Sequence, residues 1–158
     1  MYAELADSSA KLVVMHSILR HGRGTREVQD PSGVLASMYA FFANRLPALE
    51  AAGISRSRLI IDPGMGFFLG GNPEPSLRVL RELRRLKAAF GLPVWVSVSR
   101  KSFLGVITGR DVHERGAASL AAEIFCALQG ADYIRTHDVR SLRDALKVMN
   151  AIGSWDGA

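Results

Sequence analysis

The chain has 158 residues, of which 48% are hydrophobic and 22% charged, a composition that suits one globular domain and excludes a disordered polypeptide. Its formal net charge is +5, but its basic segments lack interleaved aromatic residues, so we interpret them as solvated helix faces and expect no nucleic-acid partner. No run reaches the ~18 apolar residues of a membrane span and no signal-peptide pattern is present, so we expect a cytoplasmic protein without a membrane partner.

Short apolar runs rich in β-branched residues alternate along the chain with segments of helical periodicity. The run KLVVMHS from Lys11 precedes a helical pattern over 34–51, and RLIIDPG from Arg58 precedes one over 75–90. The run PVWVSVS from Pro93 precedes a pattern over 115–128, and ADYIRTH from Ala131 precedes one over 141–152. Each predicted helix is closed by a glycine, which readily takes positive φ: Gly53, Gly91, Gly130 and Gly153.

A strand followed by a helix, four times over, predicts parallel strands joined by right-handed crossovers and hence an α/β fold. Two architectures fit this order: an open doubly wound sheet, or four consecutive units of a TIM (β/α)8 barrel. Every predicted strand ends in polar side chains. A barrel gathers all its strand ends around one mouth, whereas an open sheet needs such residues only beside its switch point. We therefore favour half of a TIM barrel, with four consecutive parallel βα units.

The second predicted strand delivers a carboxylate into the glycine-rich turn of IIDPGMGFF. Asp62 can accept two parallel N–H bonds from an amino-substituted heterocycle, and the glycines that follow allow the backbone to approach a flat ligand closely. An aspartate that only caps the turn is the alternative, and this residue alone does not separate the two.

Cationic residues follow the third and fourth predicted strands. Lys101 follows Arg100 where the third strand ends, and Ser102 begins a helical turn whose N–H groups suit an anion, so we favour a site there over a solvated loop. Arg135 and His137 alternate on the fourth strand and therefore share one face, which suits phosphate oxygens.

Several other residues have a simpler explanation. An ion pair from Arg135 to Asp132 or Asp138 explains that arginine equally well. His16 and His21 have no second ligand at metal-binding spacing, so we predict no metal site in this chain. The only cysteine, Cys126, lies in an apolar helical run and is predicted to be a buried small side chain.

The motifs DPGMGF at 62–67, SRKSFLG at 99–105 and RTHDV at 135–139, with VVMHS upstream, come in the order and at the spacing of one enzyme family. Over nearly its whole length the sequence resembles the C-terminal half of dihydropteroate synthase, and DPGMGFFL and SVSRKSFL look most like the plasmid-borne, sulfonamide-insensitive branch. The resemblance implies an eight-unit barrel of folate biosynthesis. Its substrates would be p-aminobenzoate and hydroxymethyl-dihydropterin diphosphate, which condense to dihydropteroate and diphosphate.

The resemblance also implies roles for residues at the pterin. Asp62 would bind the pterin edge, Met15 would lie beside the ring, Lys101 would bridge the pterin and p-aminobenzoate sites, and Arg135 would pack on the pterin.

The remaining implied roles concern p-aminobenzoate and the diphosphate. Ser102 and Phe67 would contact p-aminobenzoate, and His137 would face the diphosphate together with Arg135. Lys101, Arg135 and His137 are the expected catalytic residues.

The resemblance places the chain in the second half of the family's barrel. We expect residues 1–158 to be the C-terminal part of a pterin-binding TIM-barrel domain, inactive alone because the first four βα units are absent. The implied Mg²⁺ would take its protein ligand from that absent half. Exposed half-barrel edges predict a homodimer or other association. The alternatives are a non-catalytic half-barrel used as an assembly or ligand-binding module, and an unrelated doubly wound phosphate-binding protein.

Overall fold

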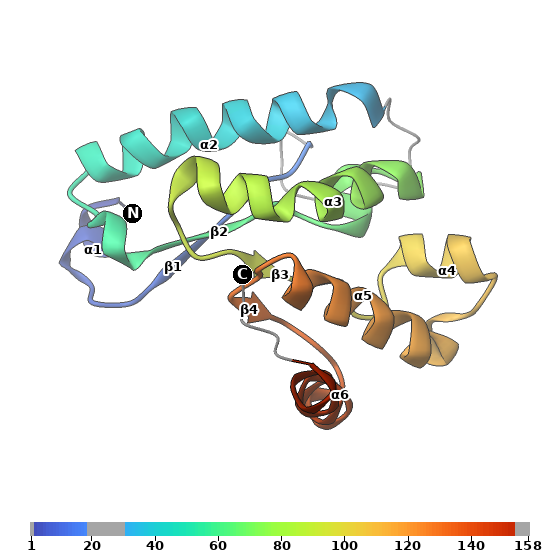
Figure 1. The fold of residues 1–158 in the computed structure, drawn as a ribbon. Helices are drawn as coiled ribbons and strands as arrows, with labels where there is room; N and C mark the ends of the chain where they lie inside the picture. The colour runs from blue at the N-terminus through green and yellow to red at the C-terminus, as the bar shows by residue number, and fades with distance from the viewer. Residues whose placement is uncertain (1, 19–30, 154–158) are drawn as a thin grey trace.

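The computed structural model describes residues 2–18 and 31–153 (Figure 1). The strands are β1 (Leu12–Met15), β2 (Leu59–Asp62), β3 (Trp95–Val96) and β4 (Tyr133–Ile134). The α-helices are α1 (Tyr2–Asp7), α2 (Val34–Ala51), α3 (Pro73–Phe90), α4 (Ser102–Thr108), α5 (Gly116–Leu128) and α6 (Val139–Ile152). Short 3-10 turns lie between them: η1 (Pro31–Gly33), η2 (Arg56–Arg58), η3 (Gly66–Leu69) and η4 (Val112–Glu114).

The strands of the described segments are all parallel and stand side by side in chain order. β1 pairs with β2, with Met15 opposite Asp62, and β3 pairs with β4. A single parallel bridge from Ile61 to Val94 joins the two pairs. In Figure 1, α2 and α3 run together along β1 and β2, while α5 contacts β4 and α6 packs against α5. The predicted α/β class and the parallel direction of the strands are confirmed, and all carboxyl ends of the strands point the same way.

Helices were easier to predict than strands. The four predicted helices match α2, α3, α5 and α6 to within two residues at each end, whereas the strands are only two to four residues long. The helices α1 and α4 were not predicted as helices, although Ser102 was expected to open a helical turn. Three of the four closing glycines take positive φ, but Gly153 does not: its φ is −154°, so α6 ends on extended backbone.

The core lies between the strands and the helices that cover them. α2 buries Met38, Phe42 and Leu46, which repeat every four residues and so form one stripe along the helix. Burying each such side chain contributes about 1.5–3 kcal/mol. Cys126 is fully buried in this core, and burial raises the pKa of its thiol to about 12, as expected of a small packing residue.

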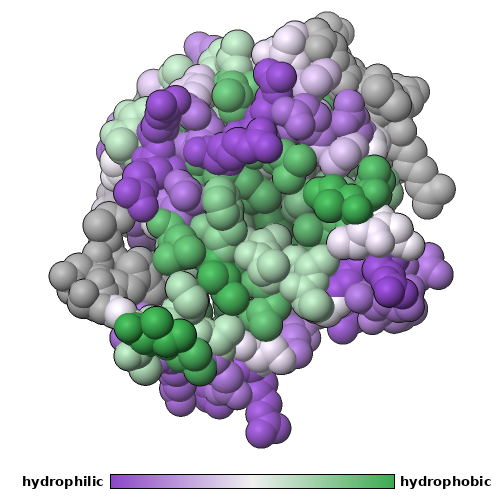
Figure 2. Space-filling view, turned by 45° about the vertical axis from the view of Figure 1, so that its right-hand side comes forward, coloured by the Kyte–Doolittle hydropathy of each residue, from purple (hydrophilic) through white to green (hydrophobic). Residues whose placement is uncertain are grey.

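Apolar side chains also gather on the surface. Figure 2 shows a face where hydrophobic residues form a broad patch. On the outside of the helices, a groove of about 390 Å³ lies between α3, α4 and α5 and is lined by apolar residues that include Leu80, Phe103, Ile107 and Phe125. None of the helices in the described ranges is both long and apolar enough to cross a membrane.

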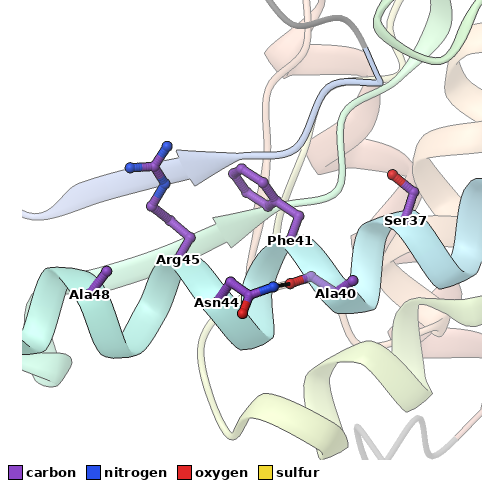
Figure 3. Close-up of a pocket in the computed structure, with 6 residues that line it drawn as sticks. All are labelled: Ser37, Ala40, Phe41, Asn44, Arg45 and Ala48. Atoms are coloured by element: carbon purple, nitrogen blue, oxygen red, sulfur yellow. Dashed lines mark hydrogen bonds between the residues drawn. The ribbon is translucent and has the colours of Figure 1, made fainter.

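A second groove, of about 440 Å³, runs along α2 beside β1 (Figure 3). Phe41 and Arg45 reach from α2 toward β1, and the Arg45 guanidinium lies 5.9 Å from the Phe41 ring centroid. In the part of the chain that the structure describes, β1 has a strand neighbour on one side only, and Val13 on it is 45% exposed. This edge of the strand array is therefore partly open to water.

Candidate functional site

Asp62 stands at the carboxyl end of β2 and is almost fully buried, with 7% of its surface exposed. Its Oδ1 accepts a hydrogen bond from the backbone N–H of Gly64 at 2.8 Å. Burial raises the pKa of the Asp62 carboxyl to about 6, because the Gly64 hydrogen bond and the cation of Lys101 offset the loss of solvation only in part. The result is a carboxylate at neutral pH that protonates on mild acidification.

The two glycines after Asp62 are required by the packing of the turn against the rest of the chain. Both take positive φ, and a Cβ built on Gly64 would collide with the carbonyl oxygen of His16. A Cβ on Gly66 would lie 3.2 Å from Cδ of Lys101 and 3.4 Å from Oγ of Ser102. The turn therefore packs closely against His16, Lys101 and Ser102, and the expected close approach to a flat ligand stays a prediction.

Lys101 lies between the turn that follows Asp62 and the residues that follow β4. Its Nζ lies 5.3 Å from the ring centroid of Phe68, within range of a cation–π interaction. Burial lowers the pKa of the Lys101 ammonium, the nearby Asp62 carboxylate opposes this shift, and the Arg135 cation adds to it. Lys101 therefore lies close enough to feel the charges of both Asp62 and Arg135, and the three residues follow three different strands.

Arg135 is not used in the ion pairs that offered a simpler explanation for it. Asp132 instead accepts from Nζ of Lys87 at 2.8 Å, and Asp138 caps α6 by accepting from the backbone N–H of Ser141 at 3.0 Å. Among the ion pairs found within the described ranges, none includes Arg135. The ion-pair interpretation is wrong, and the guanidinium remains available at the strand end.

Arg135 and His137 both lie beyond β4, which ends at Ile134, so the prediction that they alternate on this strand is wrong. The backbone N–H of His137 donates to Oγ of Ser99 at 3.2 Å, which ties the ends of β3 and β4 together. Thr136 and His137 both border a pocket of about 270 Å³. Glu123 also lines it; burial raises the pKa of its carboxyl, while side-chain hydrogen bonds from Thr136 and Ser99 oppose that shift. Sequence reasoning missed Glu123, because its neighbours gave no motif.

The other expected ligand contacts surround this group. Met15 pairs with Asp62 across the sheet and is 37% exposed, so it has solvent-facing surface beside the carboxylate. Phe67 is 38% exposed on the turn after β2, and Ser102 is the first residue of α4. Strand ends and the turns after them thus bring most of the predicted residues into one region.

The histidine that the sequence left aside is a structural residue. His16 is buried, with its Nδ1 3.1 Å from the Pro63 carbonyl and its Nε2 3.2 Å from Oγ of Ser37. A carbonyl only accepts, so Nδ1 carries the proton and Nε2 accepts from the serine. Burial lowers the pKa of this imidazole, which favours the neutral form. His21 lies outside the described residues.

Comparison with known proteins agrees with this arrangement. The family model described as "Pterin binding enzyme" matches residues 1–137. The chain belongs to the pterin-binding enzyme family. Dihydropteroate synthase type-3 of Escherichia coli is 54% identical over 153 residues, which are 97% of this chain and 58% of that protein. The chain thus spans a little over half the length of this curated member of the pterin-binding family.

Two solved structures of the family superpose closely on this fold. The dihydropteroate synthase of Stenotrophomonas maltophilia, with imidazole bound in its active site, gives a TM-score of 0.86 at 34% identity and covers 96% of this chain and 56% of its own. The enzyme of Xanthomonas albilineans in complex with 7,8-dihydropteroate gives 0.82 at 36% identity, covering 96% and 53%. The chain therefore has the TIM-barrel family fold of the dihydropteroate synthases.

Proposed function

We propose that residues 1–158 are the C-terminal part of the pterin-binding TIM-barrel domain of a dihydropteroate synthase. The observation that carries this proposal is the grouping of Asp62, Lys101 and Arg135 around one strand-end region in a fold of that family. The parallel order from β1 to β4 suits four consecutive βα units of a barrel, whose ligands bind at the carboxyl ends of the strands.

The pterin would lie against Asp62. A carboxylate at this depth can accept two N–H bonds from the amino-substituted ring, and bonds to a charged acceptor contribute about 1.5–3 kcal/mol. Met15, with exposed surface beside the carboxylate, would lie along the ring. The Lys101 ammonium and the Arg135 guanidinium would lie over the pterin and hold it in place.

The condensation joins the amino group of p-aminobenzoate to the methylene carbon of the pterin while the carbon–oxygen bond to diphosphate breaks. Negative charge grows on the departing diphosphate as the bond breaks. Cations fixed near it therefore lower the activation barrier of the condensation. Arg135 and His137 would take this role, with Lys101 between the two substrates. Ser102 and the exposed ring of Phe67 would hold p-aminobenzoate.

The residues of the site do not suit a resident metal ion. Across the described ranges, no group of three His, Cys, Asp or Glu side chains is placed to hold one, and the Lys101 cation already lies near Asp62. Mg²⁺ prefers several oxygen ligands. We therefore derive no step through magnesium from this chain, and a Mg²⁺ of the whole enzyme would take its protein ligand elsewhere.

Calorimetry with 7,8-dihydropteroate tests the assignment of the site. We expect Asp62→Asn to weaken binding more than Ser102→Ala does, because the first change removes a charged acceptor and the second a neutral hydroxyl worth ~1 kcal/mol. Ser55→Ala, at an exposed position between α2 and η2, is the control and should bind like the unchanged chain. Equal losses in Asp62→Asn and Ser102→Ala would remove Asp62 from the role proposed here.

Turnover separates the enzyme part from a ligand-binding module. We expect no measurable condensation of p-aminobenzoate with hydroxymethyl-dihydropterin diphosphate by the 158-residue chain alone, since it spans 58% of the type-3 relative. Adding the remaining units of that relative should restore activity through the site residues named above. Restored activity that survives Lys101→Ala would contradict the proposed site.

A further inference from the structure

The turn between β3 and α4 contains a residue in an unusual conformation. Arg100 has φ of 57°, and in the described segments it is the only residue besides glycine with positive φ. A side chain in the left-handed region costs about 1–2 kcal/mol, so surrounding contacts must hold it there. The residues that follow Arg100 are Lys101 and Ser102, and their direction depends on this turn.

The first turn of α5 holds both polar backbone groups of Arg100. The N–H of Arg100 donates to Oγ of Ser119 at 2.9 Å. Its carbonyl accepts from Nη1 of Arg115 at 3.0 Å, and the same nitrogen lies 3.4 Å from the carbonyl of Lys101. A guanidinium donates through a rigid planar fork, so it can fix two successive carbonyls in one geometry.

The guanidinium of Arg115 is itself held from two other sides. Its Nε donates to the carbonyl of Arg110 at 3.0 Å. A Cβ built on Gly105, the glycine that ends the SRKSFLG motif, would collide with the guanidinium group. The motif's glycine is therefore explained by the arginine that packs on it.

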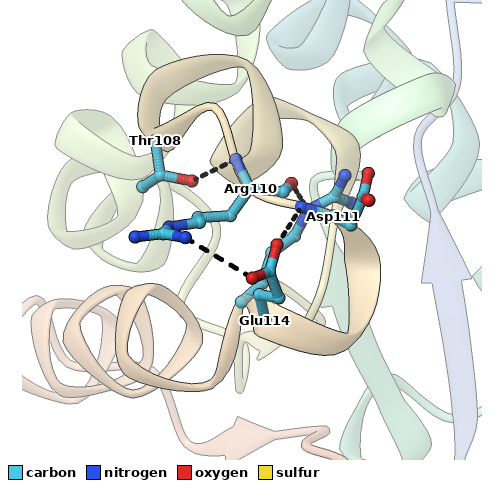
Figure 4. A network of polar contacts seen from close by, with 5 residues as sticks. Thr108, Arg110, Asp111 and Glu114 are labelled. Atoms are coloured by element: carbon cyan, nitrogen blue, oxygen red, sulfur yellow. Dashed lines mark hydrogen bonds and ion pairs between the residues drawn. The ribbon is translucent and has the colours of Figure 1, made fainter.

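The loop that supplies the Arg110 carbonyl is ordered by its own polar contacts (Figure 4). Asp111 and Glu114 form a capping box around η4, and Nη1 of Arg110 lies 3.4 Å from Oε1 of Glu114. The N–H of Arg110 donates to Oγ1 of Thr108 at 3.3 Å. The Arg110 side chain thus pairs within the loop, while its carbonyl serves Arg115.

We propose that Arg115 is a positioning residue: its guanidinium fixes the Arg100 turn and thereby sets the direction of Lys101 and Ser102 at the ligand site. The effect on ligand binding rests on the proposed function, in which Lys101 and Ser102 contact the substrates. The geometry of the turn does not depend on that function.

The test compares Arg115→Gln with the unchanged chain by NMR of lysine labelled with ¹³C at Cε. The sequence has four lysines, so the signal of Lys101 can be assigned with Lys101→Arg. We expect the pKa of Lys101, which burial lowers, to move up toward its ordinary value when the turn relaxes. Affinity for 7,8-dihydropteroate should fall about tenfold or more.

Three further variants serve as controls for this test. Arg110→Gln retains the backbone carbonyl that Arg115 uses and removes only the pair with Glu114, so both readouts should stay unchanged. Gly105→Ala leaves Arg115 in the chain but displaces its guanidinium, so it should reproduce the effects of Arg115→Gln even where that variant folds poorly. Arg115→Lys keeps the charge without the fork and should recover only part of the affinity.

The two proposals fail separately. A Lys101 titration that is the same in the unchanged chain, Arg115→Gln and Gly105→Ala overturns the positioning role. If the unchanged chain does not bind 7,8-dihydropteroate, the proposed function fails, while the Lys101 titration still decides the role of Arg115.

Discussion

Asp62 combines deep burial with a charge that the proposed function needs, and this conflict has a measurable consequence for stability. Its pKa is about 6 in the folded chain against an ordinary 3.8, so the folded state binds the proton more tightly than the unfolded state. Stability from this group is therefore present at low pH and declines as pH rises from about 4 to 6.

Asp62→Asn should accordingly stabilise the chain at neutral pH. The amide keeps an oxygen for the Gly64 N–H but carries no charge, so we expect the free energy of unfolding at pH 7.5 to rise by about 1–3 kcal/mol. Urea titrations at pH 7.5 and pH 4 measure this, and the gain should shrink at the lower pH. Asp144→Asn, at an exposed position on α6, is the control. A less stable Asp62→Asn variant at pH 7.5 would contradict the burial argument.

Ligand binding should show the same titration with the opposite sign. The pterin needs the ionised carboxylate, so affinity for 7,8-dihydropteroate should fall on acidification below about pH 6, by about tenfold per pH unit once the carboxyl is mostly protonated. Calorimetry between pH 5 and pH 7.5 measures the midpoint. The Asp62→Asn variant, with no such group, should lack this step, and a flat profile in the unchanged chain would count against ionised Asp62 as the acceptor.

At the level of elements, the sequence predicts helices with a repeating apolar pattern, but not single contacts between distant residues. The helices α2 and α3 could be placed because apolar residues, chiefly Leu in α3 and Leu, Met and Phe in α2, recur at helical spacing over 18 residues in each. The hydrogen bond from the Arg115 side chain to the Arg100 carbonyl joins residues 15 positions apart. Such a contact produces no periodic pattern in the sequence. Similarly, the glycines of the turn after β2 indicate that the backbone is closely packed there. Only the fold shows that the Gly64 backbone packs against the His16 carbonyl.

This turn can be tested through its glycines. Gly64→Ala should lower the free energy of unfolding by more than about 2 kcal/mol, because it adds a clash with the His16 carbonyl to the cost of positive φ. Gly109→Ala also has positive φ but meets open space, so it should cost only about 1 kcal/mol. Chemical denaturation of both variants gives the difference. Equal losses would show that the turn has room to relax.

At the scale of the whole molecule, two surfaces of the described chain leave apolar side chains exposed to water. Strand β1 pairs only with β2 in the described part, and its residues Val13 and Met15 are 45% and 37% exposed. The groove along α2 lies beside this same edge (Figure 3). Unpaired strand edges and apolar surface both favour association with another chain.

We therefore expect the 158-residue chain to form dimers or larger soluble species at micromolar concentration. Val13→Lys places a charge on the open edge and should shift sedimentation toward the monomer, as charged residues do on natural edge strands. Val148→Lys makes the same change on α6, where the side chain is already 58% exposed, and should leave association as it is. Analytical ultracentrifugation over a concentration series distinguishes these outcomes. A compact monomer of the unchanged chain that melts cooperatively would overturn the expectation, because it would require the β1 edge to be stable in water without a partner.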